Sequence, residues 1–374
     1  MIAPQSPGAI GGSDMHVLDL AKYQKSVGMQ PIVIERGSHL YAERLRALGI
    51  EVVSASQTSF FRAIRNLSDT IRSSNAQLVH AHGYDADYWA ATTRWVNRRL
   101  FRDRPLIFTQ HGVVEDTLRN KAKTALDALC IRTGAGVIVC AAELVPRMER
   151  WCPGQPVAYI PNGVGPFKVP SRRYARDELA HTYNTPSSPF LLGFVGRLSP
   201  EKCPHRVIEM TASLRDTGVD VHAFFAGSGP LRRSLEELAD RLGISDAVTF
   251  AGLINDMGTV YGALDALALL SDTEATPRVV IEAMSARVPV VATDVGSVRE
   301  MLGDGRLGLL VPRDDATAAI KAMREVLLGP PPQFIDAAQE YALTQHCADR
   351  MGMNVQLFYD AIFREDRRNV VRRA

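Results

Sequence analysis

Residues 266–293 have the sequence ALALLSDTEATPRVVIEAMSARVPVVAT. The apolar run Ala266–Leu270 predicts a strand, the segment Pro277–Ala286 predicts a helix, and Pro289–Thr293 predicts a second strand. Because proline suits the first position of a helix, we expect this helix to begin at Pro277. A strand, a helix and a further strand in succession are typical of a βαβ unit, in which the two strands are parallel.

Strand-like and helix-like segments alternate in the same way along most of the chain. In the first half, the candidate strands are Pro31–Glu35, Glu51–Ser54, Gln77–Ala81, Leu106–Gln110, Gly136–Ala141 and Val157–Ile160. In the second half, they are Phe190–Val195, Val221–Ala226, Ala247–Phe250, Ala266–Leu270, Pro289–Thr293 and Leu309–Val311. The sequence therefore predicts an α/β protein with two Rossmann-like, doubly wound parallel-sheet domains.

The length of 374 residues also favours two domains, because domains commonly have about 100–200 residues. Proline and glycine are frequent between residues 161 and 189, so we expect an irregular linker there. The expected parts are a first domain over residues 1–163, a second domain over residues 164–346 and a closing helical segment over residues 347–374. A helix over Ser13–Val27, with Ser13 as its N-cap, is expected near the start. Only Met1–Ala3 precede Pro4, so the first strand is short or begins before this sequence.

The bulk composition argues against several classes of protein. Charged residues make up 22% of the chain and the net charge is only +2, which is atypical of a nucleic-acid-binding protein. No apolar run has the roughly 18 residues of a membrane-spanning helix, and the first residues do not resemble a secretory signal. Five cysteines without a CxxC pair indicate neither a disulfide framework nor a zinc site. We expect a cytoplasmic protein.

The segment Arg94–Arg104 contains five arginines, together with Trp95 and Phe101. The simpler interpretation is a solvated helix end and loop. The alternative is a peripheral contact with the inner face of a membrane, because each basic residue near an anionic surface contributes about 1 kcal/mol.

Two cations follow the predicted strand Phe190–Val195. Gly196 ends the strand and permits a close approach to the backbone, and Arg197 comes directly after it. Arg197 offers a planar pair of donors to phosphate oxygens, and Lys202 offers a mobile point charge near the start of the next helix. Solvated loop cations are the alternative for each residue alone, and the carboxylates downstream favour a phosphate-binding role.

Two carboxylates stand eight positions apart around the helix start in the opening stretch. Glu274 lies just before the helix, where the N–H groups of Thr276, Arg278 and Val279 are available as donors. A carboxylate and several amides suit a hydroxylated sugar ring, and Glu282 is expected to reach ribose hydroxyls one turn deeper. The alternatives are an ordinary capping acid at Glu274 and an exposed helix acid at Glu282.

Glycine turns and histidines supply weaker candidates. Gly227 and Gly229 follow a strand, and either form a tight turn or let a nucleotide lie close to the backbone. Gly12 lies at a helix start, where N–H groups attract phosphate, and His111 stands at a strand end before Gly112. No histidine pair has metal-ligand spacing with a third ligand, so we expect no cofactor and no catalytic metal.

These motifs resemble those of the GT-B glycosyltransferases of family 4. The similar segments are Gly196–Lys202, Gly227–Pro230, the Glu-x7-Glu pair Glu274 and Glu282, the hinge-like Ile160–Val164, the Gly11-Gly12 loop and Thr109–Gly112. The resemblance covers nearly the whole chain and implies two Rossmann-like domains that face a central cleft. It implies a retaining transferase that takes a nucleotide-diphosphate sugar, with a UDP-sugar favoured over a GDP-sugar, and needs no obligate metal. The acceptor stays open among small natural products, glycans and lipid-linked sugars.

By this resemblance, Arg197 and Lys202 hold the donor diphosphate, Glu282 holds the ribose, and Glu274 with the following amides holds the sugar. Gly12 is implied near the distal phosphate and His111 near the sugar, and the closing helix crosses back to the first domain. The chain departs from the family pattern at Cys203, Ala275 and Arg287, where glycine is usual.

Two other functions remain open on the same architecture. A nucleotide-sugar 2-epimerase needs acid and base groups placed for proton abstraction. A non-catalytic nucleotide-sugar-binding subunit needs the binding residues alone.

Overall fold

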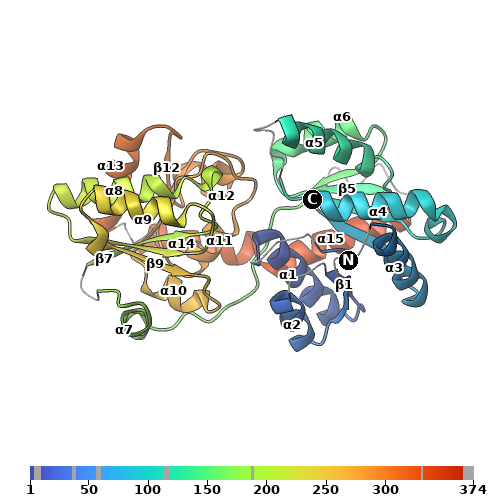
Figure 1. The fold of residues 1–374 in the computed structure, drawn as a ribbon, viewed down its shortest axis with the longest axis horizontal. Helices are drawn as coiled ribbons and strands as arrows, with labels where there is room; N and C mark the ends of the chain where they lie inside the picture. Colours follow the sequence, from blue (N-terminus) through green and yellow to red (C-terminus); the bar gives the residue numbers. More distant parts are fainter. Residues whose placement is uncertain are drawn as a thin grey trace. The chain divides into compact units, whose positions relative to one another are not determined.

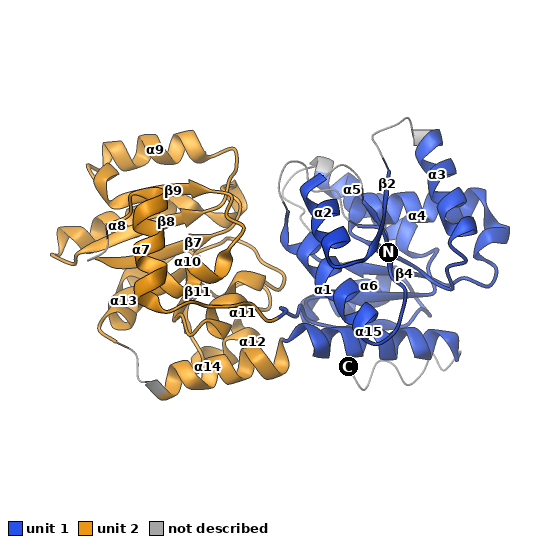
Figure 2. Ribbon diagram, turned by 90° about the horizontal axis from the view of Figure 1, so that it is seen from below, with its two compact units in different colours: residues 1–165, 347–374 blue, residues 166–346 orange. Residues whose placement is uncertain are grey.

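The computed structural model describes residues 1–3, 10–35, 39–55, 60–112, 118–186, 189–329 and 332–364. The chain divides into two compact units, of which unit 1 comprises residues 1–165 and 347–374 and unit 2 comprises residues 166–346 (Figure 2). The chain passes from unit 1 to unit 2 just after the boundary expected at residue 163. The closing segment is part of unit 1.

Unit 1 is built on short parallel strands. The strands are β1 (Ile32–Glu35), β2 (Glu51–Ser54), β3 (Val79–His82), β4 (Leu106–Gln110), β5 (Gly136–Val139) and β6 (Val157–Tyr159). The order β3-β4-β5-β6 forms one sheet, and β1 pairs with β2. Ile2 bridges Ile34 of β1 and Ala81 of β3, so residues 1–3 join the two groups of strands. The short first strand expected from the sequence therefore lies between β1 and β3.

Helices pack against these strands (Figure 1). They are α1 (Gly12–Ser26), α2 (His39–Ala47), α3 (Phe60–Ser73), α4 (Tyr84–Val96), η1 (Arg98–Phe101), α5 (Leu118–Ile131), η2 (Ala142–Leu144), α6 (Val145–Trp151) and α15 (Ala348–Phe363). The N-cap of α1 is Gly11, so the expectation of Ser13 as N-cap was wrong. The backbone N–H of Gly11 donates to Oδ2 of Asp14 at 2.7 Å, so the third residue of the helix reaches back to the N-cap backbone as in a capping box.

The closing helix α15 is fixed to unit 1 by packing and hydrogen bonds. Val355 and Phe358 lie in a core cluster with Ile107 and Ile138 of the sheet. The Tyr359 hydroxyl lies 2.5 Å from Nδ1 of His80, a buried residue of β3. Chain segments more than 270 residues apart in sequence are thus joined inside one unit, since His80 and Tyr359 are 279 positions apart.

Unit 2 contains one six-stranded parallel sheet. Its strands are β7 (Phe190–Val195), β8 (Val221–Ala226), β9 (Val248–Gly252), β10 (Ala266–Leu269), β11 (Val290–Thr293) and β12 (Leu309–Val311), in the order β12-β11-β10-β7-β8-β9. Its helices are α7 (Arg172–Tyr183), η3 (Pro200–Lys202), α8 (Pro204–Asp216), α9 (Arg232–Arg241), η4 (Ser245–Ala247), α10 (Met257–Ala263), α11 (Arg278–Ser285), α12 (Val298–Met301), η5 (Gly303–Gly305), α13 (Ala316–Leu327) and α14 (Pro332–Gln345). The parallel α/β architecture predicted from the opening stretch is confirmed.

The irregular linker predicted for residues 161–189 was partly wrong, because it contains α7. Ser171 caps this helix by accepting a hydrogen bond from the Tyr174 N–H, and Asn184 ends it in the left-handed conformation. Prolines and glycines on both sides of residues 172–183 hid a helix whose own cap residues were visible in the sequence.

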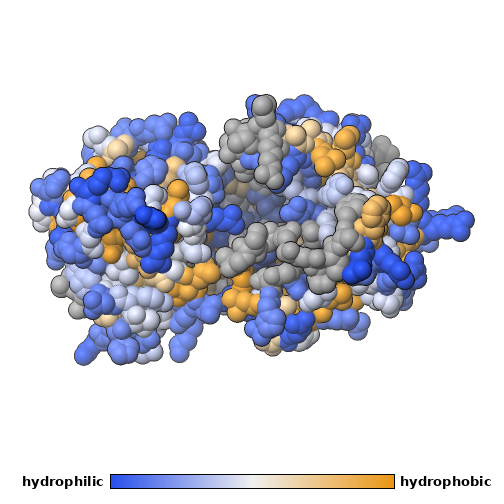
Figure 3. All heavy atoms as spheres, in the orientation of Figure 1, coloured by the Kyte–Doolittle hydropathy of each residue, from blue (hydrophilic) through white to orange (hydrophobic). Residues whose placement is uncertain are grey.

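The core of unit 2 is apolar and closely packed. Phe194 and Phe225 on neighbouring strands lie in one buried cluster with Leu198, Val207 and Ala268. On the face that Figure 3 shows, hydrophilic residues predominate and apolar patches are scattered among them. Among the residues that the structure describes, no helix has both the length and the apolar character needed to cross a bilayer.

Candidate active site

The strand order of unit 2 changes direction between β7 and β10. From β7 the chain moves outward through β8 and β9, and it then returns to the other side of β7 with β10. Ala266 of β10 lies beside Leu192 of β7 in parallel register. In open α/β sheets, ligands bind beyond the carboxyl ends of the strands at such a change of direction. Arg197 and Lys202 follow β7, and Glu274 follows β10.

Lys202 and Glu274 form an ion pair at this point. Lys202 ends η3 after β7, and Glu274 follows β10. The Lys202 Nζ donates to both carboxylate oxygens of Glu274 at 2.6 Å, and the Ser271 hydroxyl donates to Oε1 at 2.7 Å. The Glu274 side chain is 5% exposed and that of Lys202 is 28% exposed. Glu274 is therefore a buried acid held by a cation, which the interpretation as an ordinary capping acid does not explain.

Glycines allow the loops around this pair to pack together. At Gly227 the backbone has φ 150°, and a Cβ atom would lie 1.8 Å from the carbonyl oxygen of Gly196. At Gly229 a Cβ atom would lie 2.3 Å from the Leu198 carbonyl oxygen. A residue with a side chain would push the loop after β8 away from the loop that carries the cations. The tight-turn interpretation of these two glycines thus has a clear structural basis.

Gly196 and Arg197 stand on the exposed side of the loop after β7. A Cβ atom at Gly196 would meet no described atom within 4 Å, so the backbone there faces open space. Arg197 is exposed. The structure thus places an accessible guanidinium on the same short loop as the half-buried Lys202 ammonium.

Helix α11 begins one residue later than expected. Pro277 is the N-cap, with an extended backbone of φ −69° and ψ 110°, and the helix starts at Arg278. The N–H groups of Arg278 and Val279 therefore lie in the first turn of the helix. Thr276 and Arg278 are buried, and Val279 is half-buried.

Glu282 is held in place by two neighbours, so it is not a simple surface acid. The Tyr261 hydroxyl of α10 donates to Oε2 of Glu282 at 2.8 Å, and Arg278 Nε lies 3.7 Å from Oε1. Burial, together with the negative charge of Glu282, raises the pKa of Tyr261 well above its ordinary value. Tyr261 is a site residue that sequence reasoning missed, because no local motif marks it.

Two of the three departures from the family's glycines have left-handed backbone. Cys203 has φ 45° and Arg287 has φ 65°. Glycine adopts this conformation without steric cost, whereas other residues are strained there. The departures therefore replace glycine where it is favoured.

Gly12 and His111 belong to unit 1. Gly12 is the exposed first residue of α1, and His111 follows β4 and is half-buried. His111 lies in a cluster of histidine rings with His16 and His82, with ring centroids 4.8 and 5.6 Å away. Burial lowers the pKa of His82 well below its ordinary value, so this ring is neutral near pH 7.

The arginine-rich segment 94–104 separates into structural and exposed parts. Phe101 is buried, Arg94 lies over its ring at 5.9 Å, and Arg104 donates to the Ala76 carbonyl at 2.7 Å. Trp95 is 69% exposed, and Arg98, Arg99 and Arg102 are exposed as well. The exposed residues alone remain candidates for a surface contact.

Comparison with known proteins agrees with this architecture. Residues 10–166 match the model of Glycosyltransferase Family 4, and residues 175–342 match that of Glycosyl transferases group 1. A 2-deoxystreptamine glucosyltransferase of Streptomyces kanamyceticus is 25% identical over 83% of this chain and 83% of its own length. A D-inositol 3-phosphate glycosyltransferase of Saccharomonospora viridis is 32% identical over 68% of this chain and 62% of its own length.

A solved structure is similar in fold along nearly the entire chain. Anabaena HepE, crystallised in complex with UDP-glucose, superimposes with a TM-score of 0.83 at 19% identity, over 96% of this chain and 98% of that protein. The two family matches together span both units, and the relatives are glycosyltransferases. The chain therefore belongs to the GT-B glycosyltransferases of the family 4 type.

Proposed function

We propose that this protein transfers a sugar from a nucleotide-diphosphate sugar to a hydroxyl group of an acceptor, with retention of the anomeric configuration and without a required metal. A UDP-sugar is the favoured donor, and a GDP-sugar is the second candidate. The observation that carries the proposal is the ion pair of Lys202 and Glu274, on the loops after the adjacent strands β7 and β10. The pair supports the proposal because a cation can bind phosphate, a carboxylate can accept from sugar hydroxyls, and such sheets bind ligands at this edge.

The donor is proposed to lie across this corner of unit 2. Arg197 and Lys202 bind the diphosphate, since an ammonium has three donors and only part of this capacity is used by Glu274. Glu274 accepts hydrogen bonds from sugar hydroxyls, because a carboxylate offers about four lone-pair sites. Glu282 binds the ribose hydroxyls, with Tyr261 holding its carboxylate in place.

The amides at the start of α11 complete the proposed sugar site. The N–H groups of Thr276, Arg278 and Val279 donate to the sugar and to the neighbouring phosphate oxygens. Gly196, Gly227 and Gly229 let the nucleotide approach the loop backbone. In unit 1, Gly12 is proposed to face the distal phosphate and His111 the sugar.

The chemistry follows from the charge that develops on the leaving group. The bond between the anomeric carbon and the phosphate oxygen breaks, both electrons go to the oxygen, and the nucleoside diphosphate leaves. Arg197 and Lys202 stabilise this negative charge, which is the role that a metal ion has in other transferases. The acceptor oxygen bonds to the anomeric carbon from the same face, and its proton passes to the departing phosphate. This route accounts for retention without a protein nucleophile.

The relatives support the donor and indicate which acceptors to test first. The Anabaena protein binds UDP-glucose, which supports a UDP-linked donor here. The two relatives described above are named for 2-deoxystreptamine and D-inositol 3-phosphate. Both are polyhydroxylated six-membered carbocycles, so cyclitols head the acceptor panel.

Slow donor hydrolysis tests the proposal without knowledge of the acceptor. The full chain is incubated with UDP- and GDP-sugars in the presence of a chelator, and the released nucleotide is measured. We expect one UDP-sugar to be hydrolysed by the wild type and not by Glu274→Gln. In a second incubation with the acceptor panel, NMR of the glycosylated product should show the donor's anomeric configuration. Equal hydrolysis by the variant, or an inverted product, contradicts the proposal. Exchange of solvent deuterium into C2 of the sugar would instead identify an epimerase.

We also propose a peripheral membrane contact through the exposed residues Trp95, Arg98, Arg99 and Arg102. Co-sedimentation with vesicles of anionic phospholipid tests it, with neutral vesicles as the control. Binding that survives replacement of the three arginines by serine contradicts it.

A further inference from the structure

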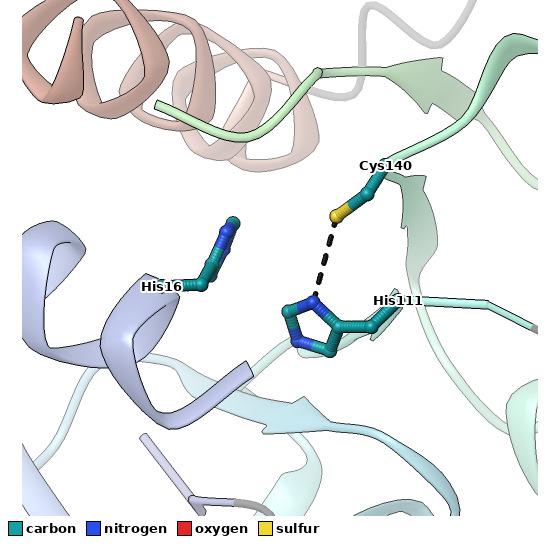
Figure 4. A group of neighbouring side chains, drawn as sticks. All are labelled: His16, His111 and Cys140. Carbon is teal, nitrogen blue, oxygen red and sulfur yellow. Dashed lines mark hydrogen bonds between the residues drawn. The ribbon is translucent and has the colours of Figure 1, made fainter. Parts of the chain in front are cut away.

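A group of three potential metal ligands lies at the carboxyl edge of the unit 1 sheet. His16 lies in the second turn of α1, His111 directly follows β4, and Cys140 directly follows β5 (Figure 4). One ligand atom of each residue lies within 4.8 Å of the others. Because β4 and β5 are neighbours in the sheet, the strand ends place His111 and Cys140 together, and α1 brings in His16.

The distance between two of these atoms fits tetrahedral coordination. Cys140 Sγ and His111 Nδ1 are 3.6 Å apart. In a tetrahedral zinc site with Zn–N about 2.0–2.1 Å and Zn–S about 2.3 Å, a nitrogen and a sulfur ligand are about 3.5 Å apart. The widest of the three separations, at most 4.8 Å, has to close by up to about 1.3 Å for all three atoms to bind one ion.

A neighbouring amide fixes the tautomer of His16. The Nδ1–H of His16 donates to Oδ1 of Asn162 at 2.8 Å, and both residues are buried. An amide oxygen only accepts, so in the neutral ring Nε2 carries the lone pair. Metal-ligating histidines commonly have their second nitrogen held in this way.

We propose that His16, His111 and Cys140 bind a soft divalent cation, with Zn²⁺ as the fitting metal. Two imidazoles and a thiolate are ligands that zinc favours over calcium or magnesium. Three protein ligands leave the fourth coordination position open to water. His111 is half-buried, whereas His16 and Cys140 are buried. The thiol proton of Cys140 is released to solvent when the metal binds.

Metal binding is measured without any sugar donor. The full chain is treated with a chelator, desalted and titrated with Cd²⁺, whose bond to a thiolate gives an ultraviolet charge-transfer band, and then with Zn²⁺ in a calorimeter. We expect one metal per chain, a band that Cys140→Ser abolishes, and affinity for Zn²⁺ weakened about 100-fold or more by His16→Asn. Asn162→Ala is expected to weaken binding about 10–100-fold while the band remains.

Cys152→Ser is the matched control, because it removes a buried thiol of the same unit that is not part of the group. Circular dichroism of each variant confirms that it is folded. Absence of the band from the wild type, or an undiminished band in folded Cys140→Ser, overturns the proposal.

One consequence rests on the proposed function. Because His111 is also the residue proposed to face the sugar, Zn²⁺ is expected to lower donor turnover in the wild type and to have less effect on Cys140→Ser. The metal titration contains no donor, so its failure is distinguishable from a failure of the proposed transferase activity.

Discussion

Replacing Lys202 by methionine removes the cation that lies 2.6 Å from both carboxylate oxygens of Glu274. Methionine has a similar length and no charge, so the apolar packing of the side chain is kept. The Glu274 side chain is 5% exposed. In the variant, its carboxylate loses both hydrogen bonds from Lys202 and keeps the one from the Ser271 hydroxyl. The change tests whether this pair is both a structural and a functional element.

The expected loss of stability follows from the burial of the two partners. Exposed ion pairs contribute about 0–1 kcal/mol, whereas breaking a fully buried pair costs about 3–5 kcal/mol. Because Lys202 is 28% exposed, we expect a loss of about 2–3 kcal/mol. For a domain of about 150–250 residues, this lowers the melting temperature by roughly 4–12 °C. Transfer should fall by about 10²–10³, as for the loss of one group that stabilises a developing oxyanion.

Differential scanning calorimetry and donor turnover measure the two effects. In Lys202→Met/Glu274→Gln, part of the melting temperature should return because the uncompensated charge is gone, while turnover stays low. Arg197→Gln is the matched control: this cation is exposed, so turnover should fall at an unchanged melting temperature. A Lys202→Met protein that melts like the wild type, or a double variant that melts no higher than Lys202→Met, would refute the reasoning.

Three further predictions concern other parts of the molecule. Tyr261→Phe removes the hydrogen bond that holds the Glu282 carboxylate. Because such a bond is worth about 1 kcal/mol, the KM for the donor should rise about 5–10-fold at a similar kcat. A changed kcat at constant KM argues against the ribose-binding role of Glu282. Gly227→Ala should lower the melting temperature far more than Gly218→Ala. A Cβ at Gly227 meets a carbonyl oxygen at 1.8 Å, whereas one at Gly218 meets no described atom within 4 Å. Equal decreases in melting temperature contradict this account of the packing. Burial raises the pKa of Asp127 to about 7, and burial together with Asp127 raises the pKa of the neighbouring Asp87 well above its ordinary value. The unfolded values are about 3.9, so the protonated carboxyls favour the folded state at low pH, and stability declines as pH rises from about 4 to about 7. Urea unfolding should show this decline, and Asp127→Asn should reduce it, with Asp87 accounting for the rest.

The sequence predicted the architecture well because its signals are local. The apolar runs, the glycines after strands and the helix patterns all lie within a few residues of the elements that they specify. The sequence also placed Glu274 before a helix start and Glu282 inside that helix, as the structure shows for α11. The start of α11 was one residue wrong, because Pro277 adopts an extended backbone and serves as the cap.

The contacts that complete the site were beyond local reasoning. Lys202 and Glu274 are 72 positions apart, and Tyr261 meets Glu282 from a separate helix. The group of His16, His111 and Cys140 was missed because one member lies in α1 and the others follow β4 and β5, so no ligand spacing appears in the chain. Only the order of the strands within each sheet brings the members of each pair or group together.

A crystal structure of the full chain with the nucleotide sugar selected from the donor panel tests the central claim most directly. We predict diphosphate oxygens within hydrogen-bonding distance of Arg197 and Lys202, with a sugar hydroxyl on Glu274. Density for the bound donor on another surface, with neither cation in contact with phosphate, would contradict the account.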